Sequence, residues 1–219
     1  MKIILASASP RRRELLKWLN IEFKSVSTDV NEARIEKESA PAMVERLSHS
    51  KATTAHENVP DALIVAADTD VELVAADGSC AILGKPRSAK EAREMLHALR
   101  GRAHNVFTGF TIAKDENRET ELVHSRVFMR DYSDAEIERY IASGDPFDKA
   151  AGYAVQHEGF RPVARVDGCF ANVMGLPLCR LYHALARHIA MPAPRLECIA
   201  HPEENCSVEK LVMDGKSYQ

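Results

Sequence analysis

A cluster of small residues and arginines follows the first apolar run of the chain. Ser7–Arg13 reads Ser-Ala-Ser-Pro-Arg-Arg-Arg and begins a helical pattern. Ser9 suits the N-cap position and Pro10 the first helical position. Arginines there face the positive end of the helix dipole, which disfavours each by up to about 1 kcal/mol. Because a bound polyanion reverses that sign, the segment predicts a phosphate site; a solvated basic turn is the alternative.

Carboxylates follow a second apolar run. Ile64–Ala67 is entirely apolar, and Asp68, Thr69 and Asp70 come directly after it. Residues 68 and 70 share one face if the strand continues through them. Two carboxylates on one face can hold Mg²⁺ or Mn²⁺, and one of them can instead activate a water as general base. A turn rich in Asp and Thr is the alternative, and this segment alone does not decide between them.

A lysine lies on a constrained corner in Leu83–Arg87, which reads Leu-Gly-Lys-Pro-Arg. The glycine spacing differs from that of a P-loop, and Pro86 stands where Ser or Thr would bind Mg²⁺. We therefore reject the Walker motif. Lys85 can still meet a phosphate as a point charge.

The segment Ser143–Gln156 combines a Gly-Asp-Pro turn with the ion pair Asp148-Lys149 and with Gln156. The Gln156 amide offers both a donor and an acceptor, which recognition of a nucleobase requires. A capped surface loop with an ion pair of little energetic value is the alternative, and the segment taken alone favours it.

The composition narrows the classes of function. The net charge of −3 gives no support for a broad face that binds a nucleic-acid polymer. The sequence contains no uninterrupted apolar stretch of membrane-spanning length, so we expect no membrane partner. The 5 cysteines are odd in number and form no Cys-x-x-Cys pair, which is typical of free thiols in a reducing, cytoplasmic setting.

Short apolar runs alternate with helical patterns, which is typical of α/β proteins. Ser88-Ala-Lys-Glu91 and Ser133-Asp-Ala-Glu136 each fit the capping box. Because a hairpin mixes with helical crossovers, we expect an elongated mixed sheet flanked by helices. The predicted elements are strands at Ile3–Ala6, Phe23–Ser27, Leu63–Ala67, Asn105–Ile112 and Val123–Arg130, a hairpin from Val71 to Leu83 turning at Asp77-Gly78, and helices at Pro10–Leu19, Ala42–His56, Ser88–Leu99, Asp134–Ala142 and Leu178–Ile189.

Six short segments, in one order along the chain, carry a resemblance to a known family. They are Leu5–Arg12, Ala67–Thr69, Gly84–Pro86, Ser143–Pro146, Asp148–Ala150 and Val173–Pro177. With these segments the chain resembles the Maf (septum formation inhibitor-like) nucleoside triphosphate pyrophosphatases. The resemblance implies a domain over residues 1–193 with two lobes around a cleft, a fold similar to that of the inosine-triphosphate pyrophosphatases, and often a homodimer. Residues 194–219 are then a C-terminal tail or flap.

The resemblance also implies a cytoplasmic hydrolase that splits a nucleoside triphosphate between the α- and β-phosphates with a divalent cation, Mg²⁺ or Mn²⁺. Asp68 is the implied proton acceptor, and Glu32 assists it with the metal. Arg11, Thr69 and Gln156 match positions associated with the kind that hydrolyses dTTP and UTP. The remaining implied substrate-binding residues are Ser7, Ser9, Arg12, Lys51, Lys85, Asp148 and Lys149.

This sequence departs from the family pattern at several positions. Ala151 and Ala154 stand where the family has glycines, Cys169-Phe170 replaces a Ser-Tyr pair, and Asp70 replaces an apolar residue. These changes bear on base preference more than on the reaction. Two other hypotheses are a non-catalytic nucleotide-binding regulator of cell division and a phosphatase that releases orthophosphate. A pure binder has no need of a general base, so Asp68 argues against the first.

Overall fold

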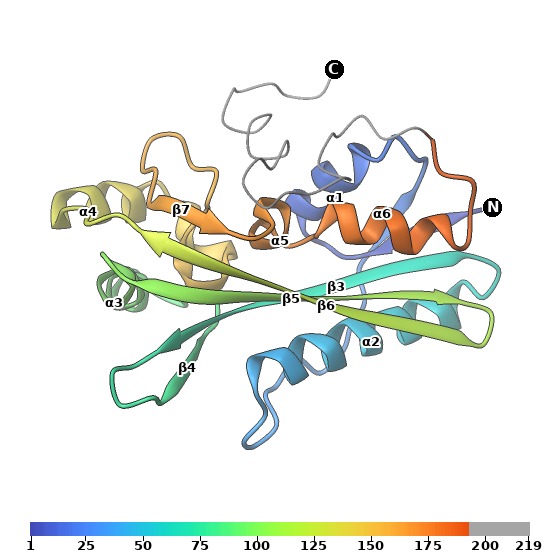
Figure 1. The fold of residues 1–219 in the computed structure, drawn as a ribbon, viewed down its shortest axis with the longest axis horizontal. Coiled ribbons are helices and arrows are strands. Elements are labelled where there is room, and N and C mark those ends of the chain that lie inside the picture. The colour runs from blue at the N-terminus through green and yellow to red at the C-terminus, as the bar shows by residue number, and fades with distance from the viewer. Residues whose placement is uncertain (193–219) are drawn as a thin grey trace.

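Seven strands form one long mixed sheet, which a computed structural model describes for residues 1–192 (Figure 1). The strand order is β2-β1-β3-β5-β6-β7, and β4 pairs with β3 beside this path. β1 is parallel to both of its neighbours, and the other pairs are antiparallel. The strands are β1 (Ile3–Ala6), β2 (Lys24–Val26), β3 (Leu63–Val74), β4 (Cys80–Leu83), β5 (Ala103–Lys114), β6 (Asn117–Met129) and β7 (Val163–Asp167).

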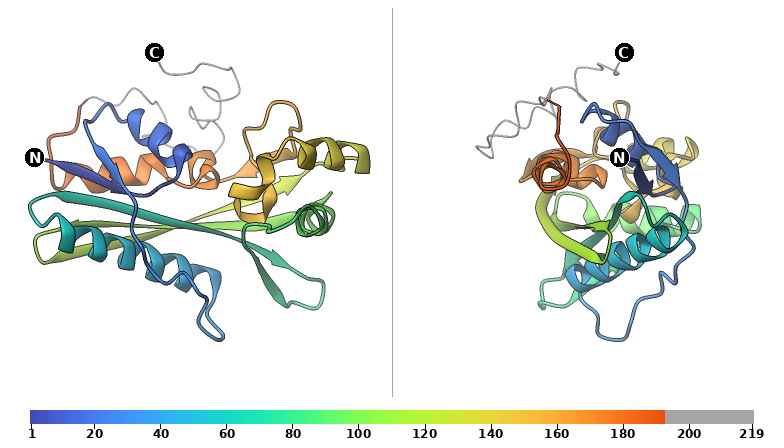
Figure 2. Two further views of the ribbon diagram at one scale, coloured as in Figure 1. Left: turned by 180° about the vertical axis from the view of Figure 1, so that it is seen from behind. Right: turned by 90° about the vertical axis from the view of Figure 1, so that its right-hand side faces the viewer.

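Helices cover both faces of this sheet (Figure 2). One face is covered by α2 (Ala40–Asn58), and the opposite face by α1 (Pro10–Lys17), α5 (Phe170–Met174) and α6 (Leu178–Ala186). α3 (Ala89–Leu99) and α4 (Asp134–Ala142) lie together at one end of the molecule (Figure 1). Two short 3₁₀ turns, Asp145–Asp148 and Ala150–Gly152, follow α4. The predicted elongated mixed sheet flanked by helices is confirmed.

Most predicted elements are present and differ only at their ends. The structure differs from the prediction in three other ways. The strand predicted at Leu63–Ala67 continues without a break into the first arm of the predicted hairpin, so that both belong to β3. β7 and α5 were not predicted, because five residues are too few to show a period. The capping box is reciprocal at Ser133, whereas the Glu91 carboxylate accepts from Arg87 N instead of from Ser88 N. The predicted tail over 194–219 lies outside the described residues.

The alternation of β3 sends its side chains to two different layers. Ile64 and Ala66 pack with Ala52 and Ala55 of α2, whereas Val65, Ala67 and Val71 belong to the larger core on the opposite face. Asp68 and Asp70 continue the first series, and Thr69 continues the second. The predicted common face of residues 68 and 70 therefore exists, and it is the face that α2 covers.

One edge of β3 is open at these same residues. β1 pairs with β3 only as far as Ala66, and β4 begins to pair at Val71. Between them, no strand within the described part of the chain pairs with residues 67–70 on this side. Because the edge is open, side chains on both faces of β3 are reachable from one hollow.

A glycine lets α2 lie close enough to serve this edge. Gly109 of β5 stands directly opposite Asp68, and a Cβ built on it would lie 2.5 Å from the Val44 carbonyl oxygen of α2. Any larger residue would push the helix outward. The close approach brings Lys51, two turns further along α2, against β3.

Candidate active site

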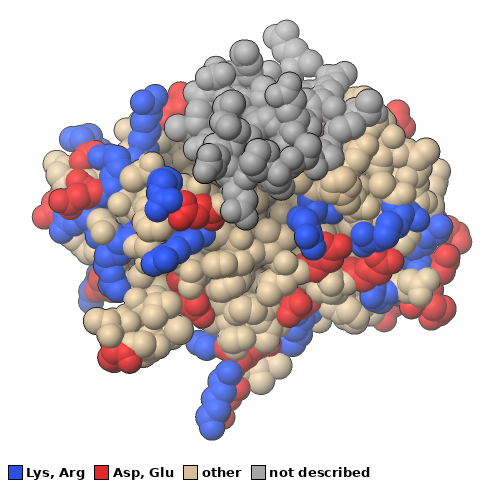
Figure 3. Space-filling view, in the orientation of Figure 1, with Lys and Arg blue, Asp and Glu red and all other residues tan. Residues whose placement is uncertain are grey.

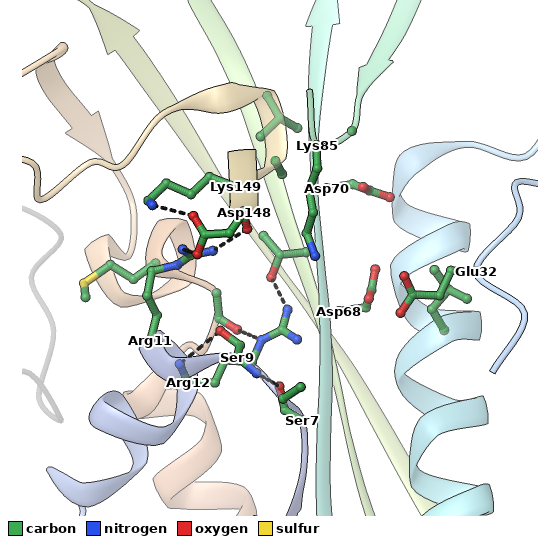
Figure 4. Close-up of a pocket in the computed structure, with 18 of the residues that line it drawn as sticks. Ser7, Ser9, Arg11, Arg12, Glu32, Asp68, Asp70, Lys85, Asp148 and Lys149 are labelled. Atoms are coloured by element: carbon green, nitrogen blue, oxygen red, sulfur yellow. Dashed lines mark hydrogen bonds and ion pairs between the residues drawn. The ribbon is translucent and has the colours of Figure 1, made fainter. Parts of the chain in front are cut away.

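A cavity of about 740 Å³ opens at the free edge of β3 (Figure 4). Its lining includes every residue that the sequence predicted for a site: Ser7, Ser9, Arg11, Arg12, Glu32, Lys51, Asp68, Thr69, Lys85, Asp148, Lys149 and Gln156. The structure thus brings together residues from the turn after β1, α1, the loop after β2, α2, β3, the Gly84 corner and the segment after α4.

The N-terminal turn of α1 forms one wall. Ser9 caps the helix by accepting from Arg12 N at 3.4 Å, and the Ser7 hydroxyl accepts from Ser9 N at 3.2 Å. The two neighbouring arginines diverge. Arg11 donates to Asp148 Oδ2 at 3.0 Å, across the cavity mouth, whereas Arg12 turns inward to the Gly175 carbonyl at 2.8 Å. The solvated basic turn is therefore wrong for Arg12, whose pKa burial lowers.

Arg12 begins a chain of hydrogen bonds that runs along one face of the sheet, from β3 to β5 and then to α5. Its Nη2 donates to Thr69 Oγ1 at 3.0 Å, Thr69 and Thr108 share a hydrogen bond of 2.9 Å, and Thr108 Oγ1 donates to the Asn172 carbonyl at 3.0 Å. Each hydroxyl has one proton, so the direction follows: Thr69 donates to Thr108. Every hydroxyl in this chain has both a donor and an acceptor, which fixes the orientation of Arg12.

Carboxylates and a lysine form the opposite wall, on the α2 side of β3. The Lys51 ammonium lies 2.6 Å from Glu32 Oε1 and 2.6 Å from Asp68 Oδ1. Lys51 and Asp68 are buried, whereas Glu32 is on an exposed loop. Burial opposes ionisation of Glu32, but the hydrogen bond and charge of Lys51 outweigh it and hold the pKa of Glu32 below its usual value.

Asp70 lines the same wall without a comparable partner. Its residue is 8% exposed, and its Oδ2 is buried without a hydrogen-bond partner. Figure 4 shows its carboxylate on the same side of β3 as that of Asp68. Burial and then the charge of Asp68 raise the pKa of Asp70 to about 7. The wall therefore carries more acceptor capacity than its own residues satisfy.

The loop after α4 closes the third side. Lys149 is buried, and its ammonium donates to the Asp145 carbonyl at 2.6 Å, to Asp145 Oδ1 at 2.9 Å and to Asp148 Oδ1 at 2.6 Å. These contacts use all three ammonium protons, so in this conformation Lys149 holds the loop together. Burial works against ionisation of Asp148, but Lys149 and Arg11 outweigh it and lower its pKa. The loop is exposed at Gly144 and Asp148, as the surface-loop interpretation expects, and it also forms part of the cavity.

Backbone geometry ties this loop to the Gly84 corner. Ala151 N donates to the Gly84 carbonyl at 2.9 Å, and Ala151 has φ 57°, in the left-handed region that favours glycine. Lys85 is exposed beside the cavity. Sequence reasoning missed other lining residues, among them Arg34 and the apolar pair Met43 and Leu47. Their only signal was proximity to Glu32 and to α2.

A metal ion has suitable donors here but no preformed cage. Glu32, Asp68 and Asp70 offer the carboxylate oxygens that Mg²⁺ and Mn²⁺ prefer. Within the described residues, no group of three or more His, Cys, Asp or Glu side chains is arranged to hold an ion. Lys51 occupies the position between Glu32 and Asp68. The donor chemistry fits a divalent cation, provided that side chains rearrange around it.

Charges of both signs lie on the face drawn in Figure 3, where basic and acidic side chains of the described residues are interspersed. None of the helices in the described residues is long and apolar enough to cross a membrane.

The protein is thus an α/β protein with one cavity wall whose arginines suit a small polyanion and an opposite wall whose carboxylates suit a cation. The chain belongs to the Maf-like protein family, whose model matches residues 2–188. The resemblance seen in the sequence is thereby confirmed.

Curated relatives cover nearly the same length. The chain is 43% identical over 189 residues to a dTTP/UTP pyrophosphatase of Dictyoglomus thermophilum, covering 85% of this chain and 95% of that protein. It is 44% identical over 192 residues to a dTTP/UTP pyrophosphatase of Myxococcus xanthus, covering 88% and 94%. A solved nucleoside-triphosphatase / dITP/XTP pyrophosphatase of Mycobacterium abscessus matches with a TM-score of 0.43 and 18% identity, covering 87% of this chain and 100% of that chain. That structural similarity is too low to support an argument.

Proposed function

We propose that this protein is a nucleoside triphosphate pyrophosphatase that hydrolyses dTTP and UTP, or modified nucleotides of that type, to the monophosphate and pyrophosphate. Membership of the Maf-like family and the names of two relatives above 40% identity support the reaction class. The observation that carries the proposal is a single cavity in which the Lys51–Asp68 pair faces the Arg11 and Arg12 wall.

In the proposed reaction, a water oxygen bonds to the α-phosphorus and the bond from that phosphorus to the bridging oxygen breaks. Pyrophosphate leaves with the bridging oxygen, and Asp68 accepts the proton of the water. Lys51 holds Asp68 Oδ1, which leaves Oδ2 outside that ion pair. Such a reaction depends on positioning and on charge stabilisation more than on covalent chemistry.

The cations of the cavity bind and stabilise the phosphates. Hydrogen bonds to Thr69 and to the Gly175 carbonyl fix the guanidinium of Arg12. Its charge is therefore already in position for the phosphates, and the side chain does not have to reorganise at each turnover. Arg11, Lys85 and the Ser7 and Ser9 turn complete the phosphate-binding wall. In this proposal Lys149 supports the substrate by keeping Asp148 in place beside Arg11.

Glu32 and Asp68 would hold a divalent cation. A bound Mg²⁺ or Mn²⁺ would draw negative charge from the phosphate oxygens. The cavity residues then need to exclude bulk water and to keep the water molecule near Asp68.

In the same proposal, the nucleobase of the substrate lies beside Gln156. A second hollow of about 520 Å³ adjoins the cavity and is lined by Arg11, Asp148, Lys149 and Gln156, among others. Gln156 lines both hollows, and its amide can donate and accept toward the edge of a pyrimidine. A homodimer and a cytoplasmic location are part of the same proposal, carried over from the resemblance.

A panel of nucleotides with identification of products tests the function. The eight common ribo- and deoxyribonucleoside triphosphates are each incubated with the protein and Mg²⁺ or Mn²⁺. We expect monophosphate and pyrophosphate, fastest with dTTP and UTP. Orthophosphate as the first product would identify a phosphatase, and binding without turnover of any nucleotide would favour the regulator.

A further inference from the structure

The carboxylate of Asp70 is unusual for where it lies. It is buried, one of its oxygens lacks a hydrogen-bond partner, and it lines the cavity on the same side of β3 as Asp68. Leaving a buried carboxylate oxygen unsatisfied costs free energy, so a bound group that uses this oxygen would be favoured here.

Charge at this wall points to a cation. Glu32, Asp68 and Asp70 provide three carboxylates, and Lys51 is the one ammonium that contacts any of them among the described residues. Lys85, Arg34 and Arg12 act on these carboxylates only at longer range. A small divalent ion neutralises such an excess better than a further water or hydroxyl group does.

The proposed function places a metal at Glu32 and Asp68, and the following step rests on it. We propose that Asp70 is a third carboxylate ligand, and that it lets this protein bind Mg²⁺ or Mn²⁺ before any nucleotide arrives. Asp68 and Asp70 supply fixed donors from one rigid strand, and exposed Glu32 moves from Lys51 to complete the set. An apolar residue at position 70, which the family pattern has, leaves two carboxylates, one of them exposed.

Binding of Mn²⁺ to the nucleotide-free, full-length protein tests this directly. Free Mn²⁺ is followed by its electron paramagnetic resonance signal during titration of the wild type, Asp70→Asn, Asp70→Val and Glu72→Gln. Glu72 is the matched control, because it lies on the same face of β3, bonds Asn105 at 3.1 Å and does not line the cavity. Melting temperatures without metal verify that each variant is folded.

We expect Asp70→Asn and Asp70→Val to weaken Mn²⁺ binding by at least roughly tenfold, because loss of a group that only supports a metal ligand already costs about ten- to a hundredfold. Glu72→Gln should bind Mn²⁺ as the wild type does. Without metal, both Asp70 variants should melt at a higher temperature than the wild type, and added Mn²⁺ should narrow that difference.

Two results overturn the proposal: unchanged Mn²⁺ affinity in the folded Asp70 variants, or a wild type that takes up no Mn²⁺ without nucleotide. Pyrophosphate release at saturating Mn²⁺ is measured on the same samples. If no nucleotide is hydrolysed although Mn²⁺ binding depends on Asp70, the proposed function fails and the metal site stands.

Discussion

The two faces of β3 at the cavity are built in opposite ways. On the Thr69 face, Arg12 donates to Thr69, and Thr69 donates to Thr108. Thr108 in turn donates to the Asn172 carbonyl. On the Asp68 face, Lys51 is shared by two carboxylates and Asp70 keeps a buried oxygen without a partner. A saturated network fixes a side chain in place, whereas an unsaturated one retains capacity for a ligand. The first face orients the arginine, and the second is prepared for water and metal.

The largest expected effect comes from the unsaturated face. Asp68→Asn removes the proposed proton acceptor and should lower the rate of pyrophosphate release by about 10²- to 10⁴-fold. Because Lys51 keeps its contact with Glu32, the fold should persist. Steady-state kinetics with dTTP and a melting curve measure both, with Glu72→Gln as control. Near-normal turnover in folded Asp68→Asn would remove Asp68 from this role and make the contrast between the faces purely structural.

The Thr69 face of the sheet also carries a titrating group, His104 of β5, which is 2% exposed. Its Nε2 shares a 2.7 Å hydrogen bond with the Tyr153 hydroxyl, and burial lowers its pKa to about 4. In the unfolded chain the His104 imidazole takes up a proton near pH 6.5, whereas in the folded protein it stays neutral down to about pH 4. Above pH 6.5 protonation of His104 therefore takes nothing from the free energy of unfolding. As the pH falls from 6.5 toward 4, it lowers the free energy of unfolding by about 3 kcal/mol in total.

His104→Gln should therefore flatten the acid limb of the free energy of unfolding, measured by urea denaturation at several values of pH. His124→Gln is the matched control, because His124 is exposed on the opposite face of the sheet, stacked on Phe107. An acid limb unchanged in His104→Gln would show that burial of His104 does not govern the acid stability of this face.

Gly109 determines the geometry of the Asp68 face, because it sets how closely α2 approaches Asp68. Gly109→Ala should cost about 1–3 kcal/mol of stability, since the added methyl group meets the backbone of Val44 and Glu45. It should also lower the rate of pyrophosphate release, because Lys51 moves away from Asp68. Gly84→Ala is the control for stability, as nothing lies within 4 Å of the Cβ built there. Full activity in Gly109→Ala would mean that the Lys51–Asp68 contact does not limit the reaction.

Local patterns were sufficient to predict much of this arrangement. The period of two along β3 placed residues 68 and 70 on one face, and the N-cap at Ser9, the reciprocal box at Ser133 and the Asp77-Gly78 turn follow from local chemistry. Each of these depends on residues within a few positions of one another, which is why the sequence contains the information.

The partners of the charged side chains were beyond reach of the sequence. Arg11 and Arg12 are adjacent, yet one bonds Asp148 and the other Gly175, because a helix points consecutive side chains about 100° apart. The contact of Lys51 with Asp68 depends on the approach of α2 at Gly109, which is a tertiary event. The resemblance named these residues together, but it gave no partner for any of them.

The smallest expected effect tests the chain of hydrogen bonds from Arg12 through Thr69 and Thr108. Thr108→Val keeps the shape of the side chain and removes the hydroxyl, so Thr69 loses its acceptor. The Asn172 carbonyl loses one of two donors and keeps Gly175 N at 2.9 Å. The substitution should cost up to about 3 kcal/mol if the Thr69 hydroxyl stays buried without an acceptor, and about 1 kcal/mol if it turns to another acceptor. Since Arg12 still reaches the Gly175 carbonyl, kcat should fall only a few-fold, with KM for the nucleotide rising by a similar factor.

Thr111→Val is the matched control. The Thr111 hydroxyl bonds Ser48 and Thr120 on the α2 face, so its removal should cost similar stability without changing KM. An equal rise in KM in both variants would show that the saturated chain stabilises the sheet without orienting Arg12.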